Sequence, residues 1–197
     1  APIDYDMACG VHAYLRDKGV ALRLDAAVEG FEETDSSLSV RLEGGERLET
    51  DMVVLALGVV PDTGLAKEAG LTLGGRGAIV VNDRMETSAP DIYAVGDAVQ
   101  ITHAVTGDPA WVPLAGPANK QGRIPVDNIS DRDSRYDGSQ GTSILRVFDM
   151  TVAATGLNER AAEAAGYRFD KVVTFSPSHA TYYPGASNMT IKTVFER

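Results

Sequence analysis

The sequence predicts an α/β protein, and two short apolar runs that each stop at a glycine are the main reason. Residues 51–57 and 92–95 have the length and composition of strands buried in a parallel sheet, and Gly58 and Gly96 follow them directly. Helical patterns lie before, between and after these runs. The last third of the chain instead places strand patterns around one helix, which is typical of an α+β unit.

The composition excludes several classes of protein. With 197 residues, 44% hydrophobic and 23% charged, the chain can bury a core and is not disordered. Its 28 acidic and 18 basic residues give a net charge of -10, which argues against a nucleic-acid partner and fits plain solubility. No apolar run approaches the roughly 20 residues that span a bilayer, so no membrane partner is expected. One cysteine fits a reducing cytoplasm, and three histidines without metal-like spacing predict no metal site.

The first element is a helix expected at residues 6–18, where apolar residues recur at helical spacing and Gly19 can end the helix. Cys9 and His12 lie in this helix. No base, second thiol or ligand set accompanies them, so both are interpreted as structural. The strand and hairpin patterns that follow are residues 20–24, 27–32, 39–42 and 46–49.

The first apolar run, 51–57, ends at Gly58 in a way that is compatible with a ligand at the sheet edge. A simple exit from a strand into a loop explains the same residues. A short helix is expected at 64–69. Residues 74–77 are glycine-rich, but no strong strand precedes them and no helix follows, so they predict a turn before a strand at 78–81 rather than a phosphate loop.

Residues 87–98 are the stretch around which the chain is organised. Pro90 marks a turn, and the second apolar run, 92–95, follows it. Gly96 and Asp97 stand where that run stops, at the edge where ligands of open α/β sheets bind. Glycine allows close approach to the backbone, and a carboxylate accepts hydrogen bonds from sugar hydroxyls. The alternative is that the pair merely turns the chain.

Small residues dominate the next segment, 112–123, after an excursion at 99–112 that is expected to be irregular. They would let the start of a helix approach a flat ligand, or let that helix pack tightly on a sheet. The helix is expected to continue to about residue 129, with a kink at Pro125 or a later start. Trp111 is interpreted as a packing residue.

Residues 131–141 are polar and predict a solvated linker and the best domain boundary in the chain. Asn158 is expected to cap a helix that ends near residue 165. The surrounding strands are expected at residues 143–148, 151–155, 171–175 and 190–195. Tyr182 and Tyr183 lie in the loop between the last two strands, where tyrosines beside Pro-Gly are usually surface packing.

The 87–98 stretch resembles the second FAD-binding motif of the FAD- and NAD(P)-dependent pyridine nucleotide-disulfide oxidoreductases. In that family the aspartate equivalent to Asp97 bonds the ribityl chain of FAD. Residues 112–123 resemble the family's helix beside the isoalloxazine ring. The resemblance therefore implies that cofactors contact Gly58, Gly96, Asp97, Pro113, Leu114, Ala115, Gly116 and Asn119.

Residues 178–186 resemble the coenzyme A disulfide reductase branch, in which a tyrosine of this loop reaches the other subunit's active site. That likeness implies catalytic roles for Tyr182 and Tyr183. NADH oxidases and peroxidases share the architecture and are the alternative branch. The implied fold is an incomplete two-dinucleotide-binding flavoprotein fold with Rossmann-like parallel sheets, followed by part of an α+β dimerisation domain. The implied divisions are an NAD(P)H domain, an FAD domain and a dimerisation domain at residues 1–87, 88–141 and 142–197.

The resemblance implies electron transfer from NAD(P)H through FAD to a cysteine, and on to coenzyme A disulfide or a related sulfur substrate. The printed chain contains neither dinucleotide fingerprint nor the catalytic cysteine motif. We therefore expect an interior fragment of a cytoplasmic, homodimeric enzyme, inactive by itself. A folded, non-catalytic fragment is the alternative from another class. The oxidised substrate and the choice between NADH and NADPH stay open.

Overall fold

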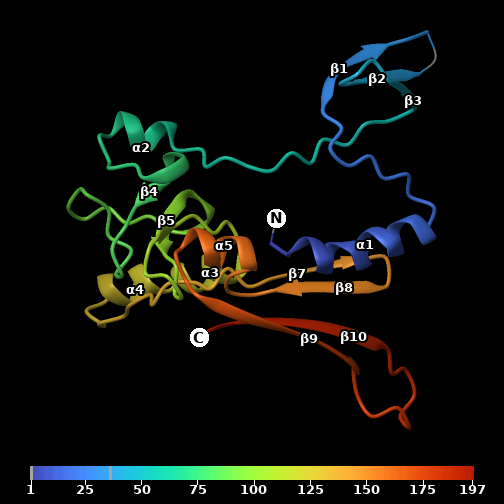
Figure 1. The fold of residues 1–197 in the computed structure, drawn as a ribbon. Helices are drawn as coiled ribbons and strands as arrows, with labels where there is room; N and C mark the ends of the chain where they lie inside the picture. Colours follow the sequence, from blue (N-terminus) through green and yellow to red (C-terminus); the bar gives the residue numbers. More distant parts are fainter. Residues whose placement is uncertain (1, 36) are drawn as a thin grey trace. The chain divides into compact units, whose positions relative to one another are not determined.

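The computed structural model describes residues 2–35 and 37–197, and Figure 1 shows the order of its elements. The helices are α1 (Tyr5–Asp17), α2 (Gly64–Glu68), α3 (Ala115–Gln121), α4 (Ile124–Ile129) and α5 (Glu159–Ala164), with 3₁₀ turns η1 (Gly75–Gly77) and η2 (Gly96–Ala98). The strands are β1 (Val28–Glu33), β2 (Leu38–Leu42), β3 (Arg47–Thr50), β4 (Ile79–Val80), β5 (Val99–Thr102), β6 (Pro109–Ala110), β7 (Ser143–Val147), β8 (Met150–Ala154), β9 (Phe169–Pro177) and β10 (Asn188–Glu196). None of the helices in the described part of the chain is both long enough and apolar enough to cross a membrane.

The chain divides into two compact units. Cys9–Val59 forms one unit, and the residues up to Ala8 together with Val60–Arg197 form the other. The smaller unit contains the antiparallel sheet β1-β2-β3, in which β2 and β3 make the hairpin that the sequence predicts. Leu42 is its most buried apolar residue, at 4% exposure.

The larger unit has its core around a small mixed sheet. Strand β4 pairs in parallel with β5, and β5 pairs antiparallel with β6. The apolar side chains buried in this region are Ala78, Met85, Val99, Ile101 and Ile124. The parallel pairing and the surrounding helices make this part an α/β structure, in agreement with the predicted fold class.

The last third of the chain is the predicted α+β unit. It consists of two antiparallel hairpins, β7–β8 and β9–β10, with α5 between them in sequence (Figure 1). Asn158 caps α5 as expected, because its side-chain oxygen accepts a 2.9 Å hydrogen bond from the Ala161 N–H. Gly166, at φ 79°, follows the end of this helix.

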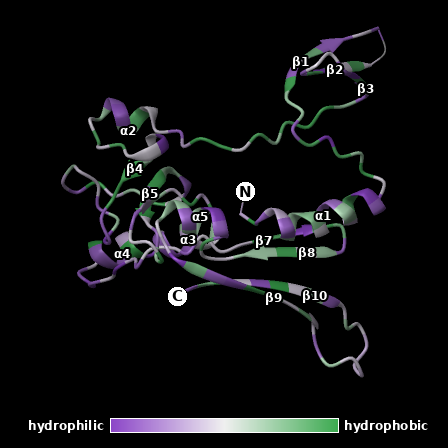
Figure 2. Cartoon of the chain, viewed as in Figure 1, coloured by the Kyte–Doolittle hydropathy of each residue, from purple (hydrophilic) through white to green (hydrophobic). Residues whose placement is uncertain are grey.

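The apolar runs 51–57 and 92–95 and residues 20–24 were wrongly predicted to be strands. Residues 51–57 are extended but unpaired, and 92–95 make only one isolated bridge, between Tyr93 and Glu86. A strand exists only when a neighbour accepts and donates its backbone hydrogen bonds, and the described residues offer these segments no adjacent strand. Figure 2 colours much of the segment between β3 and α2 as hydrophobic, although Leu57 is 93% exposed.

Two other segments also differ from expectation. Residues 99–112 are not irregular throughout, because β5 and β6 form an antiparallel hairpin in which Thr102 pairs with Pro109. The helix expected to run to residue 129 is instead two helices, with a break at Gly122 and Arg123. Pro125 lies in the first turn of α4, where its missing N–H costs nothing, so the expectation of a kink or a later start is confirmed.

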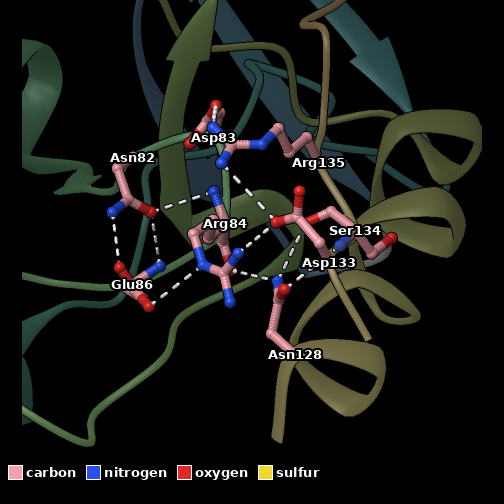
Figure 3. A network of polar contacts seen from close by, with 8 residues as sticks. All are labelled: Asn82, Asp83, Arg84, Glu86, Asn128, Asp133, Ser134 and Arg135. Carbon is pink, nitrogen blue, oxygen red and sulfur yellow. Dashed lines mark hydrogen bonds and ion pairs between the residues drawn. The ribbon is translucent and has the colours of Figure 1, made fainter. Parts of the chain in front are cut away.

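The predicted linker 131–141 is held to the rest of the larger unit by a network of hydrogen bonds and ion pairs (Figure 3). Asp133 pairs with Arg84, and the guanidinium of Arg135 lies 2.7 Å from the Asp83 carboxylate. Asn128, on α4, is 8% exposed and bonds the backbone of Ser134 in both directions. The segment is largely solvent-exposed, as predicted, but its backbone is fixed.

Candidate functional site

The turn η2 and the helix α3 meet through one buried side chain. The Gly96 N–H donates a 2.7 Å hydrogen bond to Oε1 of Gln121, whose side chain is fully buried at 1% exposure. Gly96 has φ 86°, a left-handed backbone conformation that other residues rarely adopt. The predicted pair Gly96-Asp97 is therefore a constrained turn packed on α3 and does more than end a strand.

Asp97 is held by its backbone and leaves its side chain exposed. Its carbonyl oxygen accepts a 2.6 Å hydrogen bond from the indole N–H of Trp111. Within residues 2–35 and 37–197, no side chain bonds the Asp97 carboxylate. Both carboxylate oxygens are therefore able to accept hydrogen bonds from a ligand.

The first turn of α3 presents little side-chain bulk. Pro113 and Leu114 are half-buried before the helix, whereas Ala115 and Gly116 are exposed. A Cβ added to Gly116 would meet nothing within 4 Å. Asn119 is exposed one turn later, and its side-chain oxygen accepts a 3.3 Å hydrogen bond from Arg123. A flat ligand could reach the backbone here, as the small residues led us to expect.

An open hollow of about 450 Å³ lies next to this turn. It is lined by Gly75, Arg76, Gln100, Pro109, Ala110, Trp111 and Pro113. The guanidinium carbon of Arg76 lies 5.7 Å from the centre of the Trp111 ring, a cation–π distance. Trp111 thus contacts Arg76 with its ring and bonds the backbone of Asp97 with its indole N–H.

The remaining predicted site residues lie in other parts of the chain. Gly58, at φ 97°, belongs to the extended segment of the smaller unit. Tyr182 and Tyr183 lie in the loop that joins β9 to β10, with ring centres 4.8 Å apart and exposures of 81% and 61%. Within the described part of the chain, no hydrogen bond or ring contact joins these tyrosines to η2 or α3.

Sequence reasoning missed the two residues that fix the turn, Gln121 and Trp111. The sequence does indicate that Gln121 is buried. Gln121 follows Ala118 by three positions and Pro117 by four, so it lies on the same helix face as these small residues, which are typical of a packed face. A polar side chain on such a face needs a buried partner. The partner itself, the Gly96 N–H, is 25 residues away and no local pattern identifies it.

Comparison with known proteins places this geometry in context. The family described as pyridine nucleotide-disulphide oxidoreductase matches residues 2–122. A CoA-dependent NAD(P)H sulfur oxidoreductase of Pyrococcus abyssi is 35% identical over 90% of this chain and 40% of its own length. An NADH oxidase of Methanocaldococcus jannaschii is 32% identical over 98% of this chain and 43% of its own length.

Solved structures show the same likeness. An NAD-dependent persulfide reductase from A. fulgidus superposes with a TM-score of 0.95, at 38% identity over 100% of this chain and 36% of that one. Reduced Bacillus anthracis CoADR-RHD superposes with a TM-score of 0.94, at 45% identity over 99% of this chain and 35% of that one. The chain thus spans less than half the length of each of these relatives.

Proposed function

Because the chain belongs to the pyridine nucleotide-disulphide oxidoreductase family, we propose that the full-length protein is a flavoprotein that oxidises NAD(P)H and reduces a sulfur substrate. The family's cofactors are FAD and NAD(P)H. The proposed sulfur substrate is coenzyme A disulfide or a related persulfide or polysulfide. The relatives named as sulfur oxidoreductase and persulfide reductase support this choice.

The observation that carries the proposal is the fixed turn with a free carboxylate. Gln121 and Trp111 hold the backbone of Gly96 and Asp97, so the Asp97 carboxylate is presented without having to be ordered by the ligand. These residues and the open start of α3 fit a sugar-like chain attached to a flat ring. When bound, FAD would supply the acceptor for hydride from the nicotinamide and the route of the electrons to the redox cysteine.

In this proposal the chain's own residues bind and orient. Asp97 accepts hydrogen bonds from the ribityl hydroxyls, and Pro113 to Gly116 lie along the flavin. Asn119 faces the cofactor, and Gly58 lies in the glycine loop on the nicotinamide side. The redox cysteine is supplied from outside this chain. One of Tyr182 and Tyr183, with Tyr182 as the first choice, donates a hydrogen bond at the active site of the second subunit.

The proposal extends to domains, assembly and location. Residues 1–87, 88–141 and 142–197 are assigned to the NAD(P)H, FAD and dimerisation domains of a cytoplasmic homodimer. Exposed apolar side chains on the last hairpins support a partner surface there: Ile144 is 74% exposed and Phe175 is 78% exposed. The alternative activity is that of an NADH oxidase, which the relative from Methanocaldococcus jannaschii favours.

The test is to purify the full-length protein, measure bound flavin by absorbance, and follow NAD(P)H oxidation with coenzyme A disulfide or with oxygen as the acceptor. Asp97→Ala should lose flavin, since a charge-assisted hydrogen bond contributes about 1.5–3 kcal/mol. Asp108→Ala is the matched control, because Asp108 is exposed on the adjacent β5–β6 turn and should retain flavin.

The outcomes distinguish the reductase, the oxidase and the non-catalytic alternative. Oxidation that needs the disulfide supports the reductase, and oxidation that needs only oxygen supports the oxidase. A folded protein without flavin or NAD(P)H oxidation leaves the non-catalytic alternative. Full flavin retention in a folded Asp97→Ala variant would remove this residue from the cofactor site.

A further inference from the structure

Lys192, on β10, places its ammonium group among three carboxylates. Its Nζ lies 3.0 Å from the Asp4 carboxylate and 2.7 Å from that of Asp6, and it also pairs with Glu159. The Lys192 side chain is only 5% exposed. A buried ammonium is tolerated only where it is paired and hydrogen-bonded, and this one has a carboxylate for each of its three N–H donors. The ammonium lies between the three carboxylates, so we assign no metal there.

The cluster joins segments that are far apart in the sequence. Asp4 directly precedes α1, and Asp6 lies in the first turn of that helix. Glu159 is the first residue of α5. The Asp4 carboxylate also accepts hydrogen bonds of 3.1 and 3.2 Å from the Glu159 backbone N–H. The start of α1 is therefore attached to α5 and to β10 by separate contacts.

The first turn of α1 belongs to the larger compact unit, which includes the residues up to Ala8 and Val60–Arg197. The contacts of Asp4 and Asp6 with Lys192 and Glu159 therefore lie within one unit.

We propose that Lys192 is a positioning residue: through Asp4 and Asp6 it ties the first turn of α1 to β10 and α5. In the proposed enzyme α1 belongs to the NAD(P)H domain, whereas Lys192 and α5 belong to the dimerisation domain. The tie therefore holds the start of the nucleotide-binding domain. Its kinetic consequence rests on the proposed function, but the tie itself does not.

Removing the ammonium should break the contact between the start of α1 and the residues on β10 and α5, rather than merely weaken it. Without Lys192, the carboxylates of Asp4, Asp6 and Glu159 would be like charges held close together, with oxygen atoms within 4.8 Å of one another. Lys171 offers a matched control, because it also pairs with Glu159, at 2.7 Å, but touches neither Asp4 nor Asp6 and is 51% exposed.

The experiment compares Lys192→Met with Lys171→Met in the full-length protein. Amide hydrogen exchange of Ala8, whose N–H bonds the Asp4 carbonyl oxygen at 2.9 Å, should be at least about tenfold faster in Lys192→Met and unchanged in Lys171→Met. The KM for NAD(P)H should rise at least about threefold in Lys192→Met while kcat stays within about twofold, a split that general destabilisation does not produce. Strand β5, whose Val99 and Ile101 are buried, serves as the internal reference for global opening.

Asp6→Asn keeps the proposal testable if Lys192→Met does not fold. Asp6 is 49% exposed, so this variant should fold and show the same two changes at smaller size. Equal behaviour of Lys192→Met and Lys171→Met in both measurements would overturn the proposal, as would faster exchange without a KM effect. If the parent protein oxidises no NAD(P)H, the proposed function fails, while hydrogen exchange still decides whether the tie exists.

Discussion

The backbone N–H of Gly96 is bonded to the side-chain oxygen of Gln121 at 2.7 Å. This bond joins η2, which carries the free Asp97 carboxylate, to the last residue of α3. The two elements therefore form one rigid piece, in which the first residues of α3 are exposed. Because Gln121 is fully buried, the bond is shielded from water and contributes more than an exposed one.

Gln121→Met should destabilise the protein by about 1–3 kcal/mol, because it keeps the side-chain size but leaves the Gly96 N–H without its acceptor. Urea unfolding monitored by circular dichroism measures this change, and flavin retention should fall with it. Lys120→Met, at the exposed neighbouring position, should change the free energy of unfolding by less than about 0.5 kcal/mol. Equal stability of the two variants would contradict the role assigned to Gln121.

Two members of the network in Figure 3 should differ sharply in their effects. Asn128→Leu loses its bonds to the backbone of Ser134 at 2.9 and 3.1 Å and should cost about 1–3 kcal/mol, since Asn128 is buried. Asp133→Asn removes ion pairs to Arg84 and Arg135, but its side chain is 66% exposed, so the cost should be about 0–1 kcal/mol. Thermal unfolding of both variants checks the ranking, and a larger loss for Asp133→Asn would reverse it.

The Lys192 cluster should make stability fall at acid pH. The hydrogen bond from Lys192 lowers the pKa of Asp6, and hydrogen bonds from Lys171 and then Lys192 lower the pKa of Glu159. Carboxyls with lowered pKa stabilise the fold above their ordinary values, 3.8 and 4.5, and this contribution is lost as pH falls below those values toward the folded-state pKa.

Lys192 itself adds no loss in that acid range. Burial lowers the pKa of its ammonium, but the hydrogen bonds to Asp6, Glu159 and Asp4 outweigh burial and raise it. Its contribution is present below the ordinary value of 10.5 and is lost only when pH rises through the higher folded-state pKa. Urea midpoints between pH 3 and pH 7 should therefore fall more steeply in the parent than in Lys192→Met. Parallel curves would show that other carboxyls cause the dependence.

Tyr182→Phe and Tyr183→Phe test the proposed role of the β9–β10 loop. Both side chains are exposed and neither hydroxyl makes a hydrogen bond among the described residues, so the free energy of unfolding should change little. If one hydroxyl donates to a developing thiolate, disulfide reduction should slow by about tenfold or more, while flavin reduction by NAD(P)H stays unchanged. Tyr182 is the first choice. Parental disulfide reduction in both variants would reduce the loop to a packing role.

Sequence reasoning succeeded where structure depends on near neighbours. The helix from Tyr5, the β2–β3 hairpin, the strands β7, β8, β9 and β10 and the Asn158 cap all follow from spacing, turn residues and capping within a few positions. It failed at residues 51–57 and 92–95, because an apolar run becomes a strand only beside another strand. It also missed Gln121 and the Lys192 cluster, whose partners are distant in sequence and cannot be inferred from local pattern.

The extended segment after β3 has a consequence for handling the protein. Met52, Val54, Leu55 and Leu57 are each at least 65% exposed, and the backbone there has no strand partner among the described residues. An uncharged, β-prone segment with free N–H and C=O groups is a template for pairing with the same segment of another molecule. We expect concentrated samples of the 197-residue chain to aggregate through this segment, and a charged residue in place of Val54 to slow that aggregation.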